Sequence, residues 1–273
     1  MQPTPRNTNP IRAALLAYAL LAPGLSLGLA FIGAHIVLAL LPLFTSHLLL
    51  LYATLAPSCQ WWGPVLTHFE TAEREVWITI DDGPSPEHTL AMLALLTRFE
   101  ARATFFLVGE RAEENPHLIT EILTRGHSLG NHTWSHPTRS FWCAGPARLA
   151  REIVLGAEPL RTTPERPADF FRAPVGMRNM FLHPLLARRG LGLIGWTVRG
   201  LDTVKRDATA VAERIEKGTR PGAIIVLHEG HQVARDPEFG PRCLELTLEH
   251  LAARGYRCVI PRSEQLRTSG AGR

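Results

Sequence analysis

Two adjacent carboxylates at the end of an apolar run are the first feature of this sequence that suggests chemistry. The run is Val76–Ile80, and Asp81 and Asp82 follow it directly, before Gly83-Pro84. Like charges this close do not both stay ionised in a low-dielectric site unless a cation or strong donors lie nearby. The stretch therefore predicts either a site that holds a cation or, as the alternative, a simple turn followed by a helix capped by Ser85.

A pair of histidines further along the chain offers ligands for such a cation. His132 and His136 are spaced i, i+4, which on a helical turn places both imidazoles on one face, where they can hold one metal ion. Because the chain has twelve histidines, this spacing also arises by chance. With Asp82 as the third ligand, the set becomes two histidines and a carboxylate with open positions for water, which is typical of a catalytic metal site.

The elements that must position these residues alternate along the chain from Val76 onward. Short apolar runs predict strands at 76–80, 103–108, 127–130, 169–172, 192–197, 223–227 and 257–260. Amphipathic segments predict helices at 86–99, 115–125, 146–160, 180–189, 207–217 and 240–254, with a short one from Ser263. The alternation is typical of an α/β fold with a parallel sheet. Seven strands favour a closed or nearly closed barrel; a doubly wound open sheet is the alternative.

Polar residues gather where the predicted strands end, which is where barrels of this kind carry their chemistry. Five strand ends have ionisable residues of catalytic type: Asp81–Asp82, His132–His136, Arg172–Gly176, Trp196–Asp202 and Leu227–His231. Their shared placement is more informative than any one of them. Among them, Arg199 is either a contact for an anionic group of a substrate or an ordinary surface arginine.

The N-terminal region has a different composition. No Asp, Glu, Lys or Arg occurs from Ala13 to Cys59, which is long enough for two membrane spans. An interruption that begins at Ala22-Pro23-Gly24 and includes Gly33 predicts spans near 11–30 and 34–55. The alternatives are a signal peptide, or one span with an interfacial helix. We expect a disordered tail at 1–12, a transmembrane region at 13–56 in contact with membrane lipid, and a linker at 57–75.

Charge and cysteine content exclude two classes of site. The formal net charge is only +4, and the basic residues form no dense run, so we expect no nucleic-acid partner. The four cysteines form no C-x-x-C pair, so a cysteine zinc site is not expected.

Four motifs in order resemble those of the polysaccharide deacetylases with a NodB homology domain, carbohydrate esterase family 4. They are Thr79–Pro84, His132–His136, Arg172–Gly176 and Leu227-His228. The resemblance implies a distorted (β/α)7 barrel over residues 76–267, followed by a tail at 268–273. It also implies a metal-dependent amide hydrolase that acts on N-acetylated sugars. From the apolar N-terminal region we expect the protein in a membrane, of the bacterial inner-membrane type. The side of the membrane on which the domain lies is left open.

Residue by residue, the resemblance assigns roles to these motifs. It implies that Asp82, His132 and His136 hold a divalent metal, with zinc as the first choice and cobalt or nickel as alternatives. It makes Asp81 the catalytic base and His228 the catalytic acid. Arg172 would orient the base, and the expected substrate contacts are Leu227, Trp196 and Pro174.

One departure from the family pattern leaves the substrate open. The usual D-x-x-D-W motif near the fifth strand is absent, and Asp202 is the nearest candidate to pair with His228. We therefore expect a deacetylase of an N-acetylated amino sugar in a polysaccharide, oligosaccharide or glycolipid. The alternatives are a deacylase or deformylase of a lipid-linked sugar and, in a different class, a catalytically inactive membrane-bound sugar-binding protein.

Overall fold

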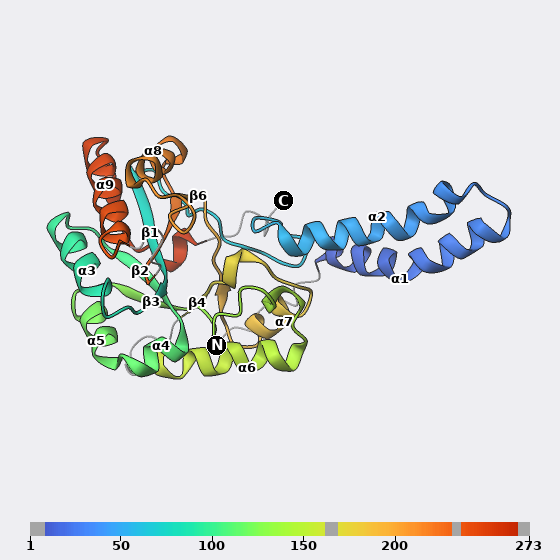
Figure 1. The fold of residues 1–273 in the computed structure, drawn as a ribbon, viewed down its shortest axis with the longest axis horizontal. Coiled ribbons are helices and arrows are strands. Elements are labelled where there is room, and N and C mark those ends of the chain that lie inside the picture. Colours follow the sequence, from blue (N-terminus) through green and yellow to red (C-terminus); the bar gives the residue numbers. More distant parts are fainter. Residues whose placement is uncertain (1–8, 162–168, 231–235, 267–273) are drawn as a thin grey trace.

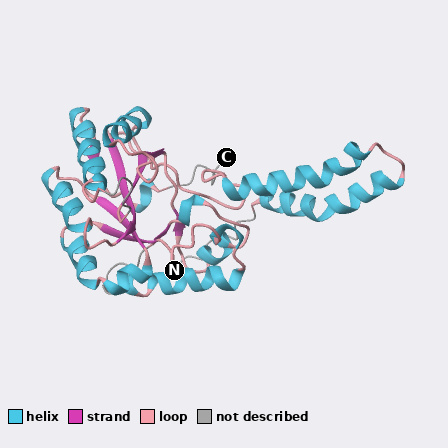
Figure 2. Cartoon of the chain, viewed as in Figure 1, coloured by secondary structure: helices cyan, strands magenta, loops and turns pink. Residues whose placement is uncertain are grey.

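The computed structural model describes residues 9–161, 169–230 and 236–266. It has an α/β domain in which the strands lie at the centre and the helices lie around them (Figures 1 and 2). A hairpin of two long helices projects from one side of this domain. Residues 1–8 and 268–273, which include most of the two predicted tails, lie outside the described ranges.

The sheet is parallel throughout the strand pairs of the described chain and is built around β1. The order is β5-β4-β3-β2-β1-β7-β6, and β8 pairs with the start of β1. The strands are β1 (Glu75–Gly83), β2 (Ala103–Leu107), β3 (Ser128–Asn131), β4 (Phe170–Phe171), β5 (Gly192–Leu193), β6 (Val198–Arg199), β7 (Ala223–His228) and β8 (Arg257–Cys258).

The sheet curls into a distorted barrel. Strands β5 and β6 stand at opposite ends of the strand order but are joined by residues 194–197 alone. Four residues span at most about 14 Å, so the two edges of the sheet must approach each other. Leu66 forms a bridge to Ile194 and His68 to Ala223, which places the segment after the helical hairpin along this gap. The predicted barrel is confirmed, although of the predicted strand at 192–197 only Gly192–Leu193 forms β5, and β6 begins just after the predicted range, at Val198.

Side chains alternate between the two faces of each strand, so the domain has two apolar cores. The outer core lies between the sheet and the helices, and the inner core lies inside the barrel. Ile78 and Ile80 of β1 face the outer helices, whereas Trp77 packs inside the barrel with Phe106 and Ile224. Side chains of a strand alternate between its two faces, so Thr79 and Asp81 share the inner face with Trp77. This periodicity places the Asp81 carboxylate inside the barrel at the carboxyl end of β1.

The helices cover the outside of the sheet (Figure 1). They are α3 (Thr89–Arg98), α4 (Gly109–Glu114), α5 (Pro116–Thr124), α6 (Pro146–Ala157), α7 (Leu182–Ala187), α8 (Ala208–Gly218) and α9 (Phe239–Ala253). Each predicted helix is present, and the short one at Ser263 is a 3-10 turn. Helix α3 begins three residues later than predicted, and Ser85 accepts backbone hydrogen bonds through its carbonyl oxygen rather than capping α3 with its side chain.

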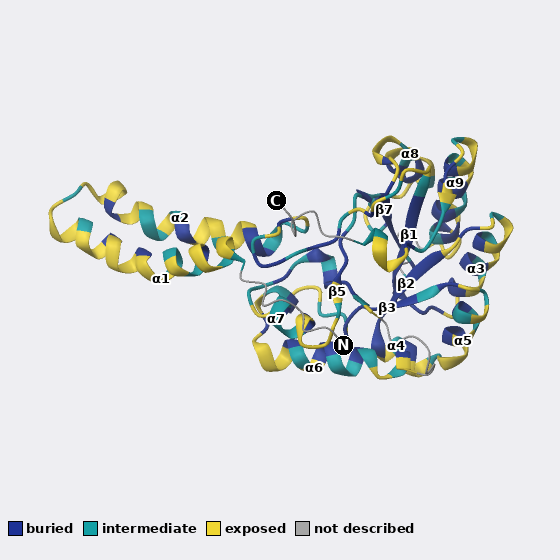
Figure 3. Cartoon of the chain, turned by 180° about the vertical axis from the view of Figure 1, so that it is seen from behind, coloured by how far each residue is buried: buried dark blue, intermediate teal, exposed yellow. Residues whose placement is uncertain are grey.

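The N-terminal helices are α1 (Pro10–Phe31) and α2 (Ile36–Leu55), and both are long and apolar enough to cross a membrane. At about 1.5 Å per residue, each is about 30 Å long. Most of their surface is exposed (Figure 3), with Leu20 81% and Phe31 92% exposed. The break between them falls at Gly33, which has a φ of +77°, and α1 continues through Pro23.

Small and polar residues join the two helices. Ala22 and Ala39 are buried in the hairpin, which lets the helices approach closely. The hydroxyl groups of Tyr18 and Thr45 lie 2.5 Å apart, and the backbone N–H of Leu43 donates to Oγ of Ser26 over 3.2 Å. These contacts fix the hairpin as one unit.

Arg178 fastens the hairpin to the domain. Its side chain is 1% exposed, and Nη1 donates to the carbonyl oxygens of Pro57 (2.9 Å) and Gly176 (3.0 Å). Nη2 donates to the carbonyl oxygen of Cys59. Pro57 and Cys59 lie just after α2, so one guanidinium connects the end of the hairpin to the loop that follows β4.

Candidate active site

Three side chains converge at the carboxyl end of the barrel. Nε2 of His132 lies 3.2 Å from Oδ1 of Asp82, and Nε2 of His136 lies 3.0 Å from the same oxygen. One ligand atom from each of the three residues lies within 4.8 Å of the other two. Two imidazole nitrogens and one carboxylate oxygen at this separation fit a single divalent ion.

Each of the two histidines can present a nitrogen lone pair to a metal ion. Nδ1 of His132 lies 2.9 Å from the carbonyl oxygen of Arg172, so a proton on Nδ1 leaves Nε2 free to coordinate. Burial lowers the pKa of His136 to about 4, with a smaller contribution from the neighbouring His132. His136 is therefore a neutral imidazole at neutral pH, which is the form that binds metals.

The loop that carries the histidines is not the helical turn that their spacing allowed. It follows β3 with left-handed φ angles at Thr133 (+69°) and His136 (+49°). Glu152 of α6 holds this loop, since its buried carboxylate accepts hydrogen bonds from the backbone N–H groups of Trp134 (3.0 Å) and Ser135 (2.9 Å) and from the Ser135 hydroxyl (2.8 Å). Glu152 has no functional signal in the sequence, because an acidic residue in an amphipathic helix normally faces solvent.

A backbone irregularity brings Asp82 to the same side as Asp81. Consecutive residues of a strand normally point to opposite faces, but Asp82 has a φ of +71° and the β1–β2 register shifts between Asp81 and Gly83.

Glu229 packs against Gly83 so closely that no Cβ would fit there, and its carboxyl group accepts a hydrogen bond from the Thr89 hydroxyl over 2.6 Å. Burial raises the pKa of Glu229 to about 8.

Asp81 forms an ion pair at the floor of the site. Nη1 of Arg172 donates to its Oδ1 over 2.5 Å and to Thr79 over 2.8 Å, and Nη2 donates to the carbonyl oxygen of Gly195 over 2.9 Å. The guanidinium lies 4.2 Å from the centre of the Phe106 ring. Burial lowers the pKa of Arg172, and the Asp81 carboxylate opposes this effect. The hydrogen bonds of the guanidinium fix the Asp81 carboxylate in one orientation.

His228 lies on the neighbouring strand, in register with Asp81. Asp202 accepts from Nδ1 of His228 over 2.9 Å and from its backbone N–H over 2.7 Å. Burial alone would lower the pKa of His228, but the Asp202 carboxylate outweighs it and raises the pKa to about 9. His228 therefore carries a proton at neutral pH, and the structure pairs it with the aspartate that the sequence suggested.

A cavity of about 170 Å³ opens over these groups. Of the predicted substrate contacts, Trp196 lines it. Leu227 belongs to the outer core, and Val226 lines the cavity beside it. Pro174 is also absent from the lining, where its neighbours Ala173 and Val175 are present. Substrate roles for Leu227 and Pro174 stay predictions.

Comparison with known proteins gives consistent results. The family model described as polysaccharide deacetylase matches residues 68–192. A chitooligosaccharide deacetylase from Bradyrhizobium sp. (strain ANU 289) is 30% identical over 189 residues, which cover 69% of this chain and 84% of that protein. A peptidoglycan-N-acetylglucosamine deacetylase from Bacillus cereus is 30% identical over 207 residues, which cover 75% and 94%.

Solved structures share the fold. A peptidoglycan N-acetylglucosamine deacetylase, crystallised with 4-naphthalen-1-yl-N-oxidanyl-benzamide, superposes with a TM-score of 0.67 and 26% identity. The superposition covers 74% of this chain and 92% of that one. The helical hairpin, α1 and α2, lies before the range matched by the family model, which begins at residue 68.

Proposed function

This chain belongs to the polysaccharide deacetylase family, whose members are hydrolases of carbon–nitrogen bonds, and from that premise we propose that it removes the acetyl group from an N-acetylated amino sugar of a glycan. One observation carries the proposal. Asp81 and His228, each held by its own buried partner, lie side by side on adjacent strands, and both line the small cavity that the three potential metal ligands also line. This arrangement supplies a base and an acid to one cavity.

We propose Asp82, His132 and His136 as the residues that hold the metal, with zinc as the first choice and cobalt or nickel as alternatives. When bound, such an ion polarises a carbonyl and acidifies water. The donor set supports this assignment, because two imidazole nitrogens and one carboxylate oxygen suit a divalent cation and leave positions for water and substrate.

Two residues of the chain carry out the two proton transfers of the reaction. Asp81, held in position by Arg172, takes a proton from the attacking water as the oxygen of that water bonds to the acetyl carbon. When the carbon–nitrogen bond breaks, the leaving nitrogen needs a proton, and His228 donates it from the imidazolium that Asp202 stabilises. The products are acetate and a free amino sugar.

The size of the cavity agrees with a small acyl group. A volume of about 170 Å³ accommodates an acetamido group and part of one sugar ring, and the Trp196 ring offers a flat wall for that ring. We also propose that α1 and α2 anchor the domain in a membrane, which would bring the site near lipid-linked as well as polymeric glycans.

Acetate release from N-acetylglucosamine oligomers by the metal-loaded protein tests the proposal. Asp81→Asn is expected to abolish release while the bound metal, measured by atomic absorption, stays at the wild-type level. His132→Ala is the matched variant, and it is expected to lose both metal and activity. Full activity in Asp81→Asn would refute the assignment of the base, and normal metal content in His132→Ala would remove that residue from the ligand set.

A further inference from the structure

Arg199 lies at the boundary between two cavities. It lines the active-site cavity together with Trp196 and His228. It also lines a second cavity of about 540 Å³, formed with α8 and the segment before that helix. Arg199 is in register with Val226 of β7, which lines the active-site cavity. A group bound in the second cavity would therefore lie next to the sugar that reacts.

The second cavity is positively charged. Four of its lining residues are basic, namely Arg199, Lys205, Arg214 and Lys217, and Glu213 is acidic. Within the described part of the chain, none of the four basic side chains forms an ion pair with a carboxylate. Nε of Arg214 donates to the carbonyl oxygen of Arg199 over 3.1 Å, which keeps these two residues together. Unpaired cations around a hollow attract anions.

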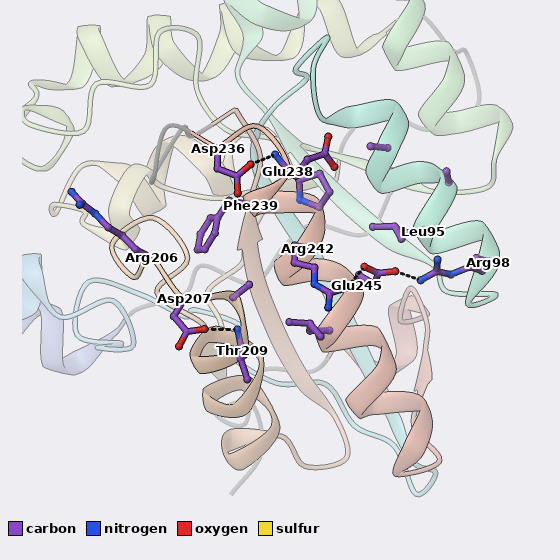
Figure 4. Close-up of a pocket in the computed structure, with 15 residues that line it drawn as sticks. Leu95, Arg98, Arg206, Asp207, Thr209, Asp236, Glu238, Phe239, Arg242 and Glu245 are labelled. Atoms are coloured by element: carbon purple, nitrogen blue, oxygen red, sulfur yellow. Dashed lines mark hydrogen bonds and ion pairs between the residues drawn. The ribbon is translucent and has the colours of Figure 1, made fainter.

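A larger cavity, which also involves residues of α8, differs in how its charges are paired. It has a volume of about 750 Å³ and lies between α3, α8 and α9 (Figure 4). Several of its charged residues engage one another or the backbone, since Glu245 pairs with both Arg98 and Arg242 at 2.6 Å, and Asp207 caps α8. This cavity also has both acidic and basic residues in its lining, whereas four of the five charged residues around the cavity beside the active site are basic.

The guanidinium of Arg199 is also oriented to bind an anionic group. Its side chain is half-buried, and the guanidinium carbon lies 5.7 Å from the centre of the Trp196 ring. Nη2 lies 3.5 Å from the Thr203 hydroxyl, which also lines the active-site cavity. A guanidinium held against an aromatic ring presents its planar donors to an oxyanion, and two parallel hydrogen bonds to phosphate or carboxylate are its strongest contacts.

We propose that Arg199, with Lys205, Arg214 and Lys217, forms a subsite for an anionic group of the substrate. The group is a phosphate or a carboxylate carried by the N-acetylated sugar or by the unit attached to it. This inference rests on the proposed deacetylase function and narrows its substrate class to acidic glycans or sugar phosphates.

Three substrates of matched size separate the possibilities. They are a neutral N-acetylglucosamine oligomer, an oligomer that alternates N-acetylglucosamine with the carboxylate-bearing N-acetylmuramic acid, and N-acetylglucosamine joined to a short lipid by diphosphate. We expect kcat/KM for at least one anionic substrate to exceed that for the neutral oligomer by about tenfold or more, which corresponds to one charged hydrogen bond. The preferred anionic substrate identifies carboxylate or phosphate, and the preference is expected to shrink as salt is raised.

Substitutions in the subsite test whether its basic residues cause the preference for anionic over neutral substrates. Arg199→Gln keeps the stem of the side chain, and the double variant Arg214→Gln/Lys217→Gln lies outside the active-site cavity. Both are expected to reduce the anionic-to-neutral ratio of kcat/KM about tenfold, mainly through KM. Arg188→Gln removes an exposed charge from the end of α7 and serves as the control that leaves the ratio unchanged.

Binding gives a readout that does not require turnover. Calorimetry with the Asp81→Asn protein is expected to show tighter binding of the anionic ligand, and weaker binding once Arg199→Gln is added. Equal affinity for neutral and anionic ligands, or an unchanged ratio in both subsite variants, would overturn the subsite. Loss of acetate release from every substrate with anion binding intact would instead count against the deacetylase function, so the two failures are distinguishable.

Discussion

Replacement of Asp202 by asparagine tests whether this residue sets the protonation state of His228. The carboxylate lies 2.9 Å from Nδ1 of the imidazole and raises its pKa from 6.5 to about 9 against the opposing effect of burial. This difference corresponds to roughly 3 kcal/mol. In Asp202→Asn the burial remains and the largest of the charges that raise the pKa is gone, while the smaller effects of Asp81 and Asp82 stay, so the pKa of His228 is expected to fall to about 6.5. The amide oxygen can still accept from the backbone N–H of His228.

The expected effect on activity follows from the fraction of protonated His228. At pH 8 that fraction is about nine in ten with a pKa near 9 and about three in a hundred with a pKa of 6.5, a fall of roughly 30-fold. If His228 is the acid, kcat in Asp202→Asn should be close to the wild-type value at pH 5.5 and about 30-fold lower at pH 8. The measurement is a pH profile of acetate release, with exposed Asp169→Asn as the matched control.

Stability provides an independent readout with a definite sign. Because the pKa of His228 is raised in the folded state, the Asp202–His228 pair stabilises the fold fully below pH 6.5, and this contribution disappears as the pH rises through 9. Asp202→Asn should therefore lower the free energy of unfolding more at pH 6 than at pH 10. A profile whose alkaline limb stays near pH 9 in the variant would refute the reasoning that Asp202 holds the proton on His228.

Three further outcomes are expected. Arg172→Met should lower the free energy of unfolding by about 3–5 kcal/mol in chemical denaturation, because Asp81 is left buried without its counter-charge; an unchanged midpoint would contradict the ion pair's role. Glu152→Ala should weaken metal binding about 10–100-fold in chelator competition, since the histidine loop loses three hydrogen bonds, and Glu152→Gln should recover part of this affinity. Gly176→Ala should lower kcat/KM with little change in metal content, because the added Cβ would lie 2.6 Å from the Trp196 ring at a φ of +74°; wild-type kinetics would show that this wall is not used.

Much of the site could be predicted because its signals are local. Asp81 and Asp82 follow an apolar run, the two histidines lie four residues apart, and parallel strands bring their carboxyl ends to one rim. Their convergence in the structure agrees with that reasoning. The pairing of Asp202 with His228 was also predictable, since the two residues end neighbouring strands.

Other features have no local signal. Glu152 looks like a solvent-facing acid in the sequence, and only the folded chain shows that its carboxylate holds the loop of the two histidines. Glu229 lies at a predicted strand end, but its contact with Gly83 and its hydrogen bond from Thr89 appear only in the folded chain. Helix α4 was missed because Gly109–Glu114 has almost no apolar residues to set a period. The apolar run at 192–197 reads as one strand, but the curl of the sheet gives its middle residue Ile194 a bridge to Leu66 instead.

The attachment of the hairpin through Arg178 affects how far the active-site opening lies from a membrane. The loop that it fastens to the end of α2 also supplies Ala173 and Val175 to the active-site cavity, and Gly176 of that loop lies between Pro57 and the Trp196 ring. If α1 and α2 span a bilayer, the opening is then held at a constant height above the lipid surface, as on a short rigid stalk. Only those sugar units that lie at this height would be processed, so the position of an amino sugar along a glycan, as well as its chemistry, would decide whether it is modified.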